Sequence, residues 1–291
     1  MAMKVGIQLY SVRNHMAQDP LGTIKKVAEA GYRYIEVANH NADKDVGVGF
    51  GVSAKEVKQL LADCNAQIFS AHIFPLDPEK MNPEKMTPML EYHQEIGTKY
   101  FVHPMDFYKD RDETLRKAEM LNKIGERCKD YGMQLLYHNH FHEFQHFGDK
   151  TIYELLMENT DPGLVQIELD TYWTTRGQQD PLALLKKYGK RVRLVHQKDF
   201  TKGYEAERDL LASVEAAGDY VDMERFSRDV RPETFTEIGT GVMDIQAIID
   251  TANEYCGSEY IVLEQDYSQH DELESIAISM DSFRKFKGVE W

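Results

Sequence analysis

The chain has 291 residues, 42% of them hydrophobic and 29% charged, enough to bury a large core in one large domain or two small ones. Aspartate and glutamate total 49 against 34 lysines and arginines, so the net charge is −15. A field of this sign repels phosphate backbones and anionic lipids, and we therefore expect neither nucleic-acid nor membrane partners.

Short runs rich in β-branched and aromatic residues recur along the chain and are typical of buried strands. In chain order they are Val5–Tyr10, Tyr34–Ala38, Gln67–His72, Tyr100–His103, Gln134–His138, Val165–Asp170, Val192–His196 and Tyr260–Glu264. Stretches with helical spacing of apolar residues lie between and after them: Leu21–Ala30, Ala54–Cys64, Glu113–Tyr131, Ile152–Met157, Pro181–Tyr188, Ile245–Tyr255 and Leu273–Phe286. Strands that alternate with helices imply parallel pairing, and eight such repeats are what a closed barrel needs. We therefore expect a single (β/α)₈ TIM barrel domain over residues 1–291.

One segment, residues 201–240, does not fit this alternation. It is polar and charged, it follows the seventh expected strand, and a helix is expected near Glu205–Ala217. Barrel loops on this side build the functional site, so the segment is expected to be either a lid or a tolerated surface insertion.

Polar side chains gather where the expected strands end. They are Glu36, His72, His103, His138, Asp170, His196 and Glu264. A closed barrel brings the carboxyl ends of its strands onto one ring, where its sites lie. Neutral imidazoles and carboxylates in a ring are what a divalent ion requires, so the sequence predicts a metal site.

Seven motifs, spread over nearly the whole chain, carry a family resemblance: GYRYIEVANH, SAHIF, LLYHNHFHEF, ELDTYW, LVHQKDF, EIGTGVMD and VLEQD. Together they resemble the sugar phosphate isomerase/epimerase superfamily, the xylose-isomerase-like barrels. The resemblance implies a small carbohydrate substrate and one Mn²⁺, Mg²⁺, Co²⁺ or Zn²⁺ ion. Carried over position by position, it implies the metal ligands His138, Asp170, His196 and Glu264.

Position 138 departs from many members, which have glutamate there as one of two carboxylates that shuttle a proton. A metal-bound imidazole nitrogen cannot carry that proton, so either Glu143 or His140 supplies the base or the reaction is not a two-carboxylate isomerisation. Superfamily frequency favours a metal-dependent isomerase or epimerase that works through an enediolate. The Tyr-His-Asn-His variant resembles inosose dehydratases and enzymes that cleave 3-keto-glycosides, so a metal-dependent lyase is the alternative.

The remaining site residues each have a functional and a structural interpretation. Glu264 is expected to be a ligand and a candidate base. Lys198 is expected to neutralise substrate charge or protonate a leaving oxygen, unless it faces solvent beside Asp199. Three further residues are expected to line the pocket: Glu36, His72 and Trp173. Their structural alternatives are a hydrogen-bonded Glu36–His72 pair and core packing of Trp173, the latter also for Phe141. A sugar-binding barrel without catalysis would predict a missing ligand, yet the four positions hold competent residues.

Two further motifs have simpler explanations. Residues 142–146 match the His-Glu-x-x-His zinc-protease signature, which works on a helix, whereas here it directly follows an expected strand and is better explained as a loop. Gly239-Thr240-Gly241 suggests a phosphate cradle, but a turn followed by Asp244 as a helix cap explains it at less cost.

The sequence favours a cytoplasmic protein. Its cysteines, Cys64, Cys128 and Cys256, are far apart and form neither zinc-finger pairs nor a disulfide pattern. We expect no secretory signal and no transmembrane span. Related barrels often form dimers or tetramers, so a homo-oligomer is compatible with the resemblance.

Overall fold

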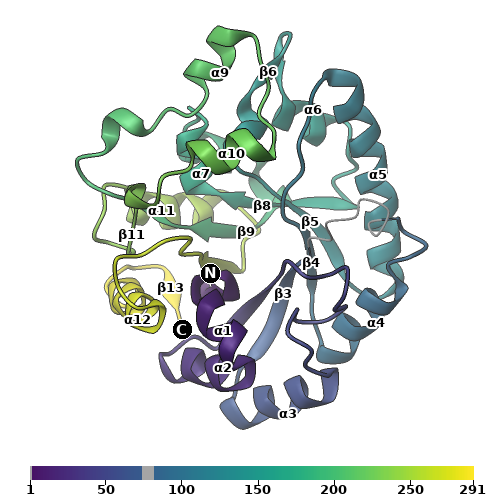
Figure 1. Ribbon diagram of the computed structural model, residues 1–291, viewed down its shortest axis with the longest axis vertical. Coiled ribbons are helices and arrows are strands. Elements are labelled where there is room, and N and C mark those ends of the chain that lie inside the picture. The colour runs from purple at the N-terminus through teal and green to yellow at the C-terminus, as the bar shows by residue number, and fades with distance from the viewer. Residues whose placement is uncertain (1, 74–81) are drawn as a thin grey trace.

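The computed structural model describes residues 2–73 and 82–291 and forms a closed parallel barrel (Figure 1). The barrel strands are β1 (Met3–Gln8), β2 (Tyr34–Asn39), β3 (Gln67–Ile73), β4 (Tyr100–His103), β5 (Gln134–His138), β8 (Val165–Asp170), β9 (Val192–Gln197) and β12 (Tyr260–Leu263). Each pairs in parallel with the next, and β12 pairs with β1 in the register Lys4–Tyr260 to Ile7–Leu263, which closes the ring. The predicted TIM barrel is confirmed.

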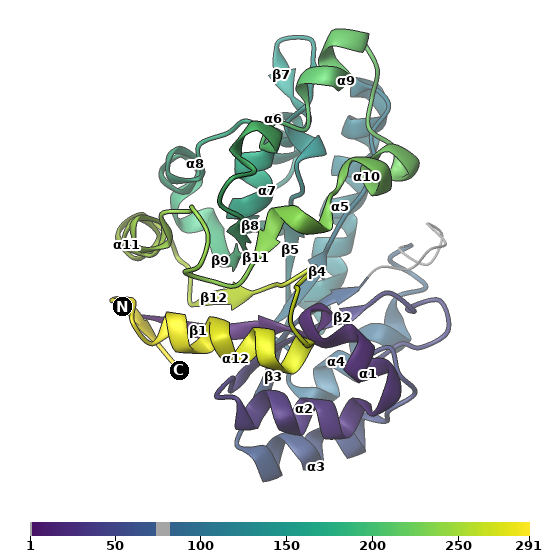
Figure 2. The same ribbon diagram turned by 60° about the vertical axis from the view of Figure 1, so that its left-hand side comes forward.

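Helices surround the barrel (Figures 1 and 2). The outer helices are α2 (Pro20–Glu29), α3 (Ala54–Cys64), α4 (Thr87–Ile96), α5 (Arg111–Asp130), α6 (Ile152–Glu158), α8 (Pro181–Tyr188), α11 (Ile245–Tyr255) and α12 (Glu272–Phe283). Capping boxes start α3, from Ser53 to Glu56, and α6, from Thr151 to Glu154. Helix α4 was not predicted from the sequence. No helix in the described ranges is both long and apolar enough to cross a bilayer.

The inside of the barrel has two layers that follow from strand geometry. The layer near the amino ends of the strands is apolar and includes Leu136, Leu194 and Val262. Residues two apart on a strand share a face, so the next inward positions are His138, His196 and Glu264. The apolar layer thus lies beneath a polar layer at the carboxyl ends of the strands, where TIM-barrel sites form.

The segment after β9 forms a small structure of its own. β10 (Asp199–Phe200) pairs antiparallel with β11 (Phe235–Thr236), and these two short strands bracket most of the insertion. Between them lie η5 (Glu205–Glu207), α9 (Ala212–Ala217), α10 (Met223–Asp229) and η6 (Pro232–Thr234). Figure 2 shows the chain termini on one side and α10, with α1 (Arg13–Gln18), toward the other.

The expected continuous helix over Glu205–Ala217 is wrong. Its first part is the short η5, and regular helix begins only at Ala212. The carboxylate of Asp209 accepts hydrogen bonds from the backbone N–H groups of Leu211 and Ala212. Such local bonds compete with the helical pattern, which explains the interruption.

Candidate active site

Two overlapping groups of buried side chains of metal-ligand type lie at the carboxyl ends of the strands. One group is His138, Asp170, His196 and Glu264, and the other is His72, His138, Glu168 and His196. In each group one ligand atom per residue lies within 4.8 Å of the others. The four residues that the resemblance implied as ligands are therefore brought together in space.

The second group was missed by the sequence analysis, because Glu168 was not recognised as a candidate ligand. Its Oε2 lies 2.5 Å from His72 Nε2 and 3.3 Å from His138 Nδ1, and the carboxyl group is fully buried. A signal was available. Glu168 and Asp170 are two apart on β8, so both face the barrel interior.

The site has an excess of buried acid. Its carboxyl groups belong to Glu36, Glu168, Asp170, Glu264 and Asp266, each at most 8% exposed. Within the site these groups pair with the ammonium group of Lys198 and contact the imidazoles of His72, His138 and His196. Glu36 Oε2 is buried and has no hydrogen-bond partner in the described chain. Buried carboxylates require compensating positive charge, so this donor set fits a divalent cation.

The protonation of the histidines follows from burial and from these carboxylates. Burial lowers the pKa of His138 to about 4, so its imidazole is neutral at pH 7, which is the form that binds metals. Burial alone would also lower the pKa of His196, but the charges of Glu168 and Glu36 raise it well above the ordinary value. His196 Nε2 lies 2.7 Å from Glu36 Oε1 and its Nδ1 lies 2.9 Å from Glu264 Oε2.

Lys198 is buried in the site rather than facing solvent. Its side chain is 1% exposed and its Nζ donates to Asp170 Oδ2 at 2.6 Å and to Glu264 Oε2. The suggested pair with Asp199 is wrong, because the Asp199 carboxylate accepts backbone N–H groups that include those of Gly239 and Gly241. Asp199 thereby fixes the turn at residues 239–241, and Asp244 caps α11 as predicted.

A pocket of about 300 Å³ opens above the metal-ligand groups. His72 and Trp173 line it, as expected, together with His138, His140 and Glu264. Glu36 does not line the pocket. It lies beneath and accepts hydrogen bonds from Gln8 and His196. Its Oε1 is 3.1 Å from His72 Nε2, but the hydrogen bond of this nitrogen is with Glu168, so the expected hydrogen-bonded Glu36–His72 pair is not formed. Phe141 is fully buried and packs against Trp173.

The two candidate bases differ in position. His140 lines the pocket, whereas Glu143 does not. Glu143 accepts hydrogen bonds from the Tyr137 hydroxyl at 2.9 Å and from the His140 backbone N–H at 2.9 Å. It therefore holds the loop after β5 in place. Asn139 contributes to the same end, since it bonds with the backbone of Asp170 in both directions.

Asp266 is a second residue that the sequence analysis did not single out. It lines the pocket, its Oδ1 lies 3.8 Å from Lys198 Nζ, and this oxygen has no hydrogen-bond partner in the described chain. Burial, together with Glu264 and Asp170, raises its pKa to about 8 although Lys198 opposes the shift. A carboxyl group that retains a proton near neutral pH can act as a hydrogen-bond donor toward a ligand.

The protease-like motif does not form a zinc site. Residues His142–Phe144 form the 3₁₀ turn η3, and His146 starts the short strand β6 (His146–Phe147), so the predicted loop is confirmed. His142 Nε2 contacts the backbone oxygen of Asp106, and His146 pairs with Glu215. The two imidazoles are thus engaged separately.

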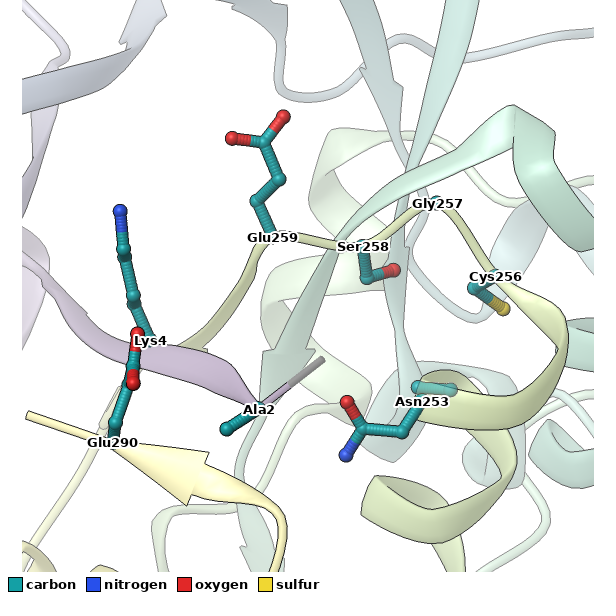
Figure 3. Close-up of a pocket in the computed structure, with 9 residues that line it drawn as sticks. Ala2, Lys4, Asn253, Cys256, Gly257, Ser258, Glu259 and Glu290 are labelled. Atoms are coloured by element: carbon teal, nitrogen blue, oxygen red, sulfur yellow. The ribbon is translucent and has the colours of Figure 1, made fainter.

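A larger cavity, of about 440 Å³, lies at the opposite end of the barrel (Figure 3). Its lining includes Lys4 on β1, Glu290 on β13 (Val289–Glu290) and Glu259, next to β12. Glu259 is engaged by Lys99 at 2.6 Å and by Arg193 at 2.9 Å. Neither metal-ligand group lies in this lining, and the amino ends of barrel strands serve stability rather than chemistry.

Comparisons with known proteins agree with this fold. A family model described as the xylose isomerase-like TIM barrel matches residues 24–286. An inosose dehydratase from Clostridium beijerinckii is 29% identical over 266 residues, which cover 84% of this chain and 81% of that protein. The crystal structure of a sugar phosphate isomerase/epimerase from Parabacteroides distasonis has a TM-score of 0.75 at 27% identity and covers 100% of this chain and 96% of its own.

A further solved structure, the IolI protein with a bound zinc atom, has a TM-score of 0.67 at 14% identity. It covers 97% of this chain and 96% of its own, and at this identity the likeness shows the fold alone. The family model, by contrast, spans most of the chain, from the first outer helix to the last. The protein therefore belongs to the xylose isomerase-like TIM barrel family.

Proposed function

We propose that the protein is a metal-dependent lyase that eliminates a leaving group from a keto-inositol or keto-sugar. The observation that carries the proposal is the pair of buried metal-ligand groups at the floor of the pocket. The likeness to an inosose dehydratase over 84% of the chain supports elimination better than the isomerase or epimerase reaction that superfamily frequency favoured.

His138, Asp170, His196 and Glu264 would hold the ion. Imidazole and carboxylate ligands suit Mn²⁺, Mg²⁺, Co²⁺ and Zn²⁺ to different degrees, and the zinc atom in the IolI protein supports an ion in this fold. A bound divalent ion would supply Lewis-acid polarisation of the substrate carbonyl. The site holds more buried carboxylates than the single positive charge of Lys198 can balance, and this excess of negative charge favours a bound cation.

The protein's own residues would move the protons. His140 lines the pocket and is kept neutral by burial, which lowers its pKa well below the ordinary value, so its imidazole is free to accept the proton next to the carbonyl. The electrons of that C–H bond form a C=C bond as the C–O bond to the leaving group breaks. Lys198 or Asp266, whose Nζ and Oδ1 atoms lie 3.8 Å apart, would donate the proton that converts the leaving hydroxyl into water.

A metal-dependent isomerase or epimerase is the second candidate, because the superposed Parabacteroides distasonis protein is a sugar phosphate isomerase/epimerase. Glu264 would then act as the base as well as a ligand. The two reactions share proton removal next to a carbonyl and differ in whether a bond to a leaving group breaks.

The test starts with metal content. We expect close to one divalent ion per chain, and we expect His196→Ala and Glu264→Gln to lose both metal and activity, while Glu259→Gln at the other end of the barrel keeps both. Incubation with keto-inositol and keto-sugar panels in D₂O separates the reactions. Release of water with an unsaturated ketone supports the lyase, and solvent deuterium in an isomeric product supports the isomerase. Full activity after exhaustive chelation contradicts both.

A further inference from the structure

The pocket has two chemically different walls. The metal-ligand side is polar and includes His72, His138, His140, Glu264 and Asp266. A second set of lining residues is apolar. We call it the apolar wall: Pro104, Met105, Met223, Phe226 and Val230. Its last three residues come from α10 and its end, so the insertion after β9 supplies most of this apolar set, together with the polar Ser227.

The apolar wall is anchored by packing. The Phe226 ring lies 5.2 Å from the His140 ring and 5.4 Å from the Phe141 ring, measured between centroids, and it is stacked on the latter. It lies 5.8 Å from Trp173. Asp222 caps α10 by accepting the Arg225 N–H, and the Arg225 side chain pairs with Asp219 at 2.9 Å. The helix is thereby held beside the residues that border the metal-ligand groups.

A free polyol ring is a poor match to this wall. Such a ring carries hydroxyls around its edge, and burying a hydroxyl without a hydrogen-bond partner is unfavourable. The polar wall can satisfy those that face it, but methionine, valine and phenylalanine side chains provide no comparable partners. Met223 is 46% exposed, which leaves adaptable apolar surface at the rim of the pocket.

We propose that the apolar wall binds an apolar substituent carried by the substrate's polyol ring. The ring would sit against the metal-ligand side, and an aromatic or aliphatic group would extend over Met223, Phe226 and Val230. This inference rests on the proposed function, because it assumes that the ring is the part that reacts. It narrows the substrate class to amphipathic keto-polyols, and it gives the insertion the role of a specificity element.

The test compares phenyl β-glucoside with methyl β-glucoside, as ligands of the metal-loaded protein, by calorimetry. Burying an aromatic ring predicts binding of the phenyl compound on the order of ten-fold tighter or more. We expect the Met223→Gln/Val230→Thr double variant to reduce this ratio to about three-fold or less. Met120→Gln, at a methionine of α5 that is 41% exposed and outside the pocket, should preserve it.

Equal binding of the two glucosides, or no measurable binding of the phenyl compound, overturns the inference. A ratio that falls equally in Met120→Gln also overturns it. Thermal melting of each variant distinguishes lost folding from a lost contact, and the single variant Val230→Thr serves if the double variant does not fold. The metal content of the purified protein and its loss in His196→Ala do not involve the apolar wall. Failure of that test would count against the proposed function, while the binding ratio still reports on the apolar wall.

Discussion

Replacing Lys198 by methionine removes the ammonium group among three carboxylates while keeping most of the side chain's length. The Nζ atom lies 2.6 Å from Asp170 Oδ2, is bonded to Glu264 Oε2 and lies 3.8 Å from Asp266 Oδ1. The side chain is 1% exposed, so the ammonium group is shielded from solvent. Removing one member of a buried ion pair destabilises a protein by about 3–5 kcal/mol, and we expect a loss of this size for the metal-free Lys198→Met variant.

The pH dependence of this loss has a definite sign. Burial would raise the pKa of Glu264, but Lys198 and His196 hold it well below the ordinary value. A group with a depressed folded-state pKa stabilises the protein above its unfolded pKa, and this contribution disappears as the pH falls through the folded pKa. Without the ammonium group the carboxyls take up protons at higher pH. The deficit of Lys198→Met should therefore be smaller at pH 5 than at pH 7.

Urea unfolding of metal-free protein at both pH values measures these quantities. Lys187→Met is the matched control, because Lys187 also pairs with a carboxylate, Glu154, at 2.8 Å, but with side chains 50% and 34% exposed. Surface pairs contribute about 0–1 kcal/mol. A loss for Lys198→Met no greater than that of the control, or one that does not shrink at pH 5, would refute the assignment of Lys198 as the cation that balances the site.

Three further predictions concern other residues. Burial lowers the pKa of His93 from 6.5 to about 4, so the unfolded state binds more protons than the folded state between these pH values. The free energy of unfolding should therefore fall by about 3 kcal/mol as the pH drops from 6.5 to 4. In His93→Gln, the urea midpoint should change less with pH over this range. Gly125→Ala places a Cβ 2.7 Å from the backbone oxygen of Leu164, so it should destabilise by about 1–3 kcal/mol despite alanine's helix propensity, and an unchanged melting temperature would contradict this contact. Glu168→Gln keeps the shape of a buried side chain that bonds two histidines, and we expect metal affinity to fall about 10–100-fold by titration, whereas wild-type affinity would remove Glu168 from the metal centre.

The barrel and its ring of polar strand ends were predictable because both depend on local patterns. Alternation of strands and helices fixes the fold class, and strand ends such as His138 and His196 meet wherever the sheet closes. The position of Lys198 was not predictable in this way. Its burial depends on Asp170, Glu264 and Asp266 from two other strand ends, and a lysine beside an aspartate in the sequence equally suggests a solvent-exposed pair.

The insertion was harder to predict for a related reason. α10 has little apolar periodicity, since its helix residues are Met223-Glu224-Arg225-Phe226-Ser227-Arg228-Asp229. Its packing is carried mainly by Phe226, against aromatic side chains that follow β5 and β8. A helix stabilised by one anchor and a cap leaves a weak pattern in the sequence. Its contribution to the pocket depends on tertiary contacts that connect residues far apart in the chain.

The two metal-ligand groups differ in their relation to Lys198, and this difference makes their use testable. In the group expected from the resemblance, Asp170 and Glu264 are both hydrogen-bonded to Lys198 Nζ, so an ion there must share those oxygens with the ammonium group or displace it. Asp170 Oδ1 is also engaged, by the Trp173 N–H at 2.7 Å. Among the described residues, the side chains of the group with His72 and Glu168 form no hydrogen bond with Lys198. If the first group holds the ion, Lys198→Met should therefore bind it more tightly than the wild type, and Glu168→Gln should reduce the affinity less. If the second group holds the ion, Glu168→Gln should reduce the affinity more, and Lys198→Met should not increase it.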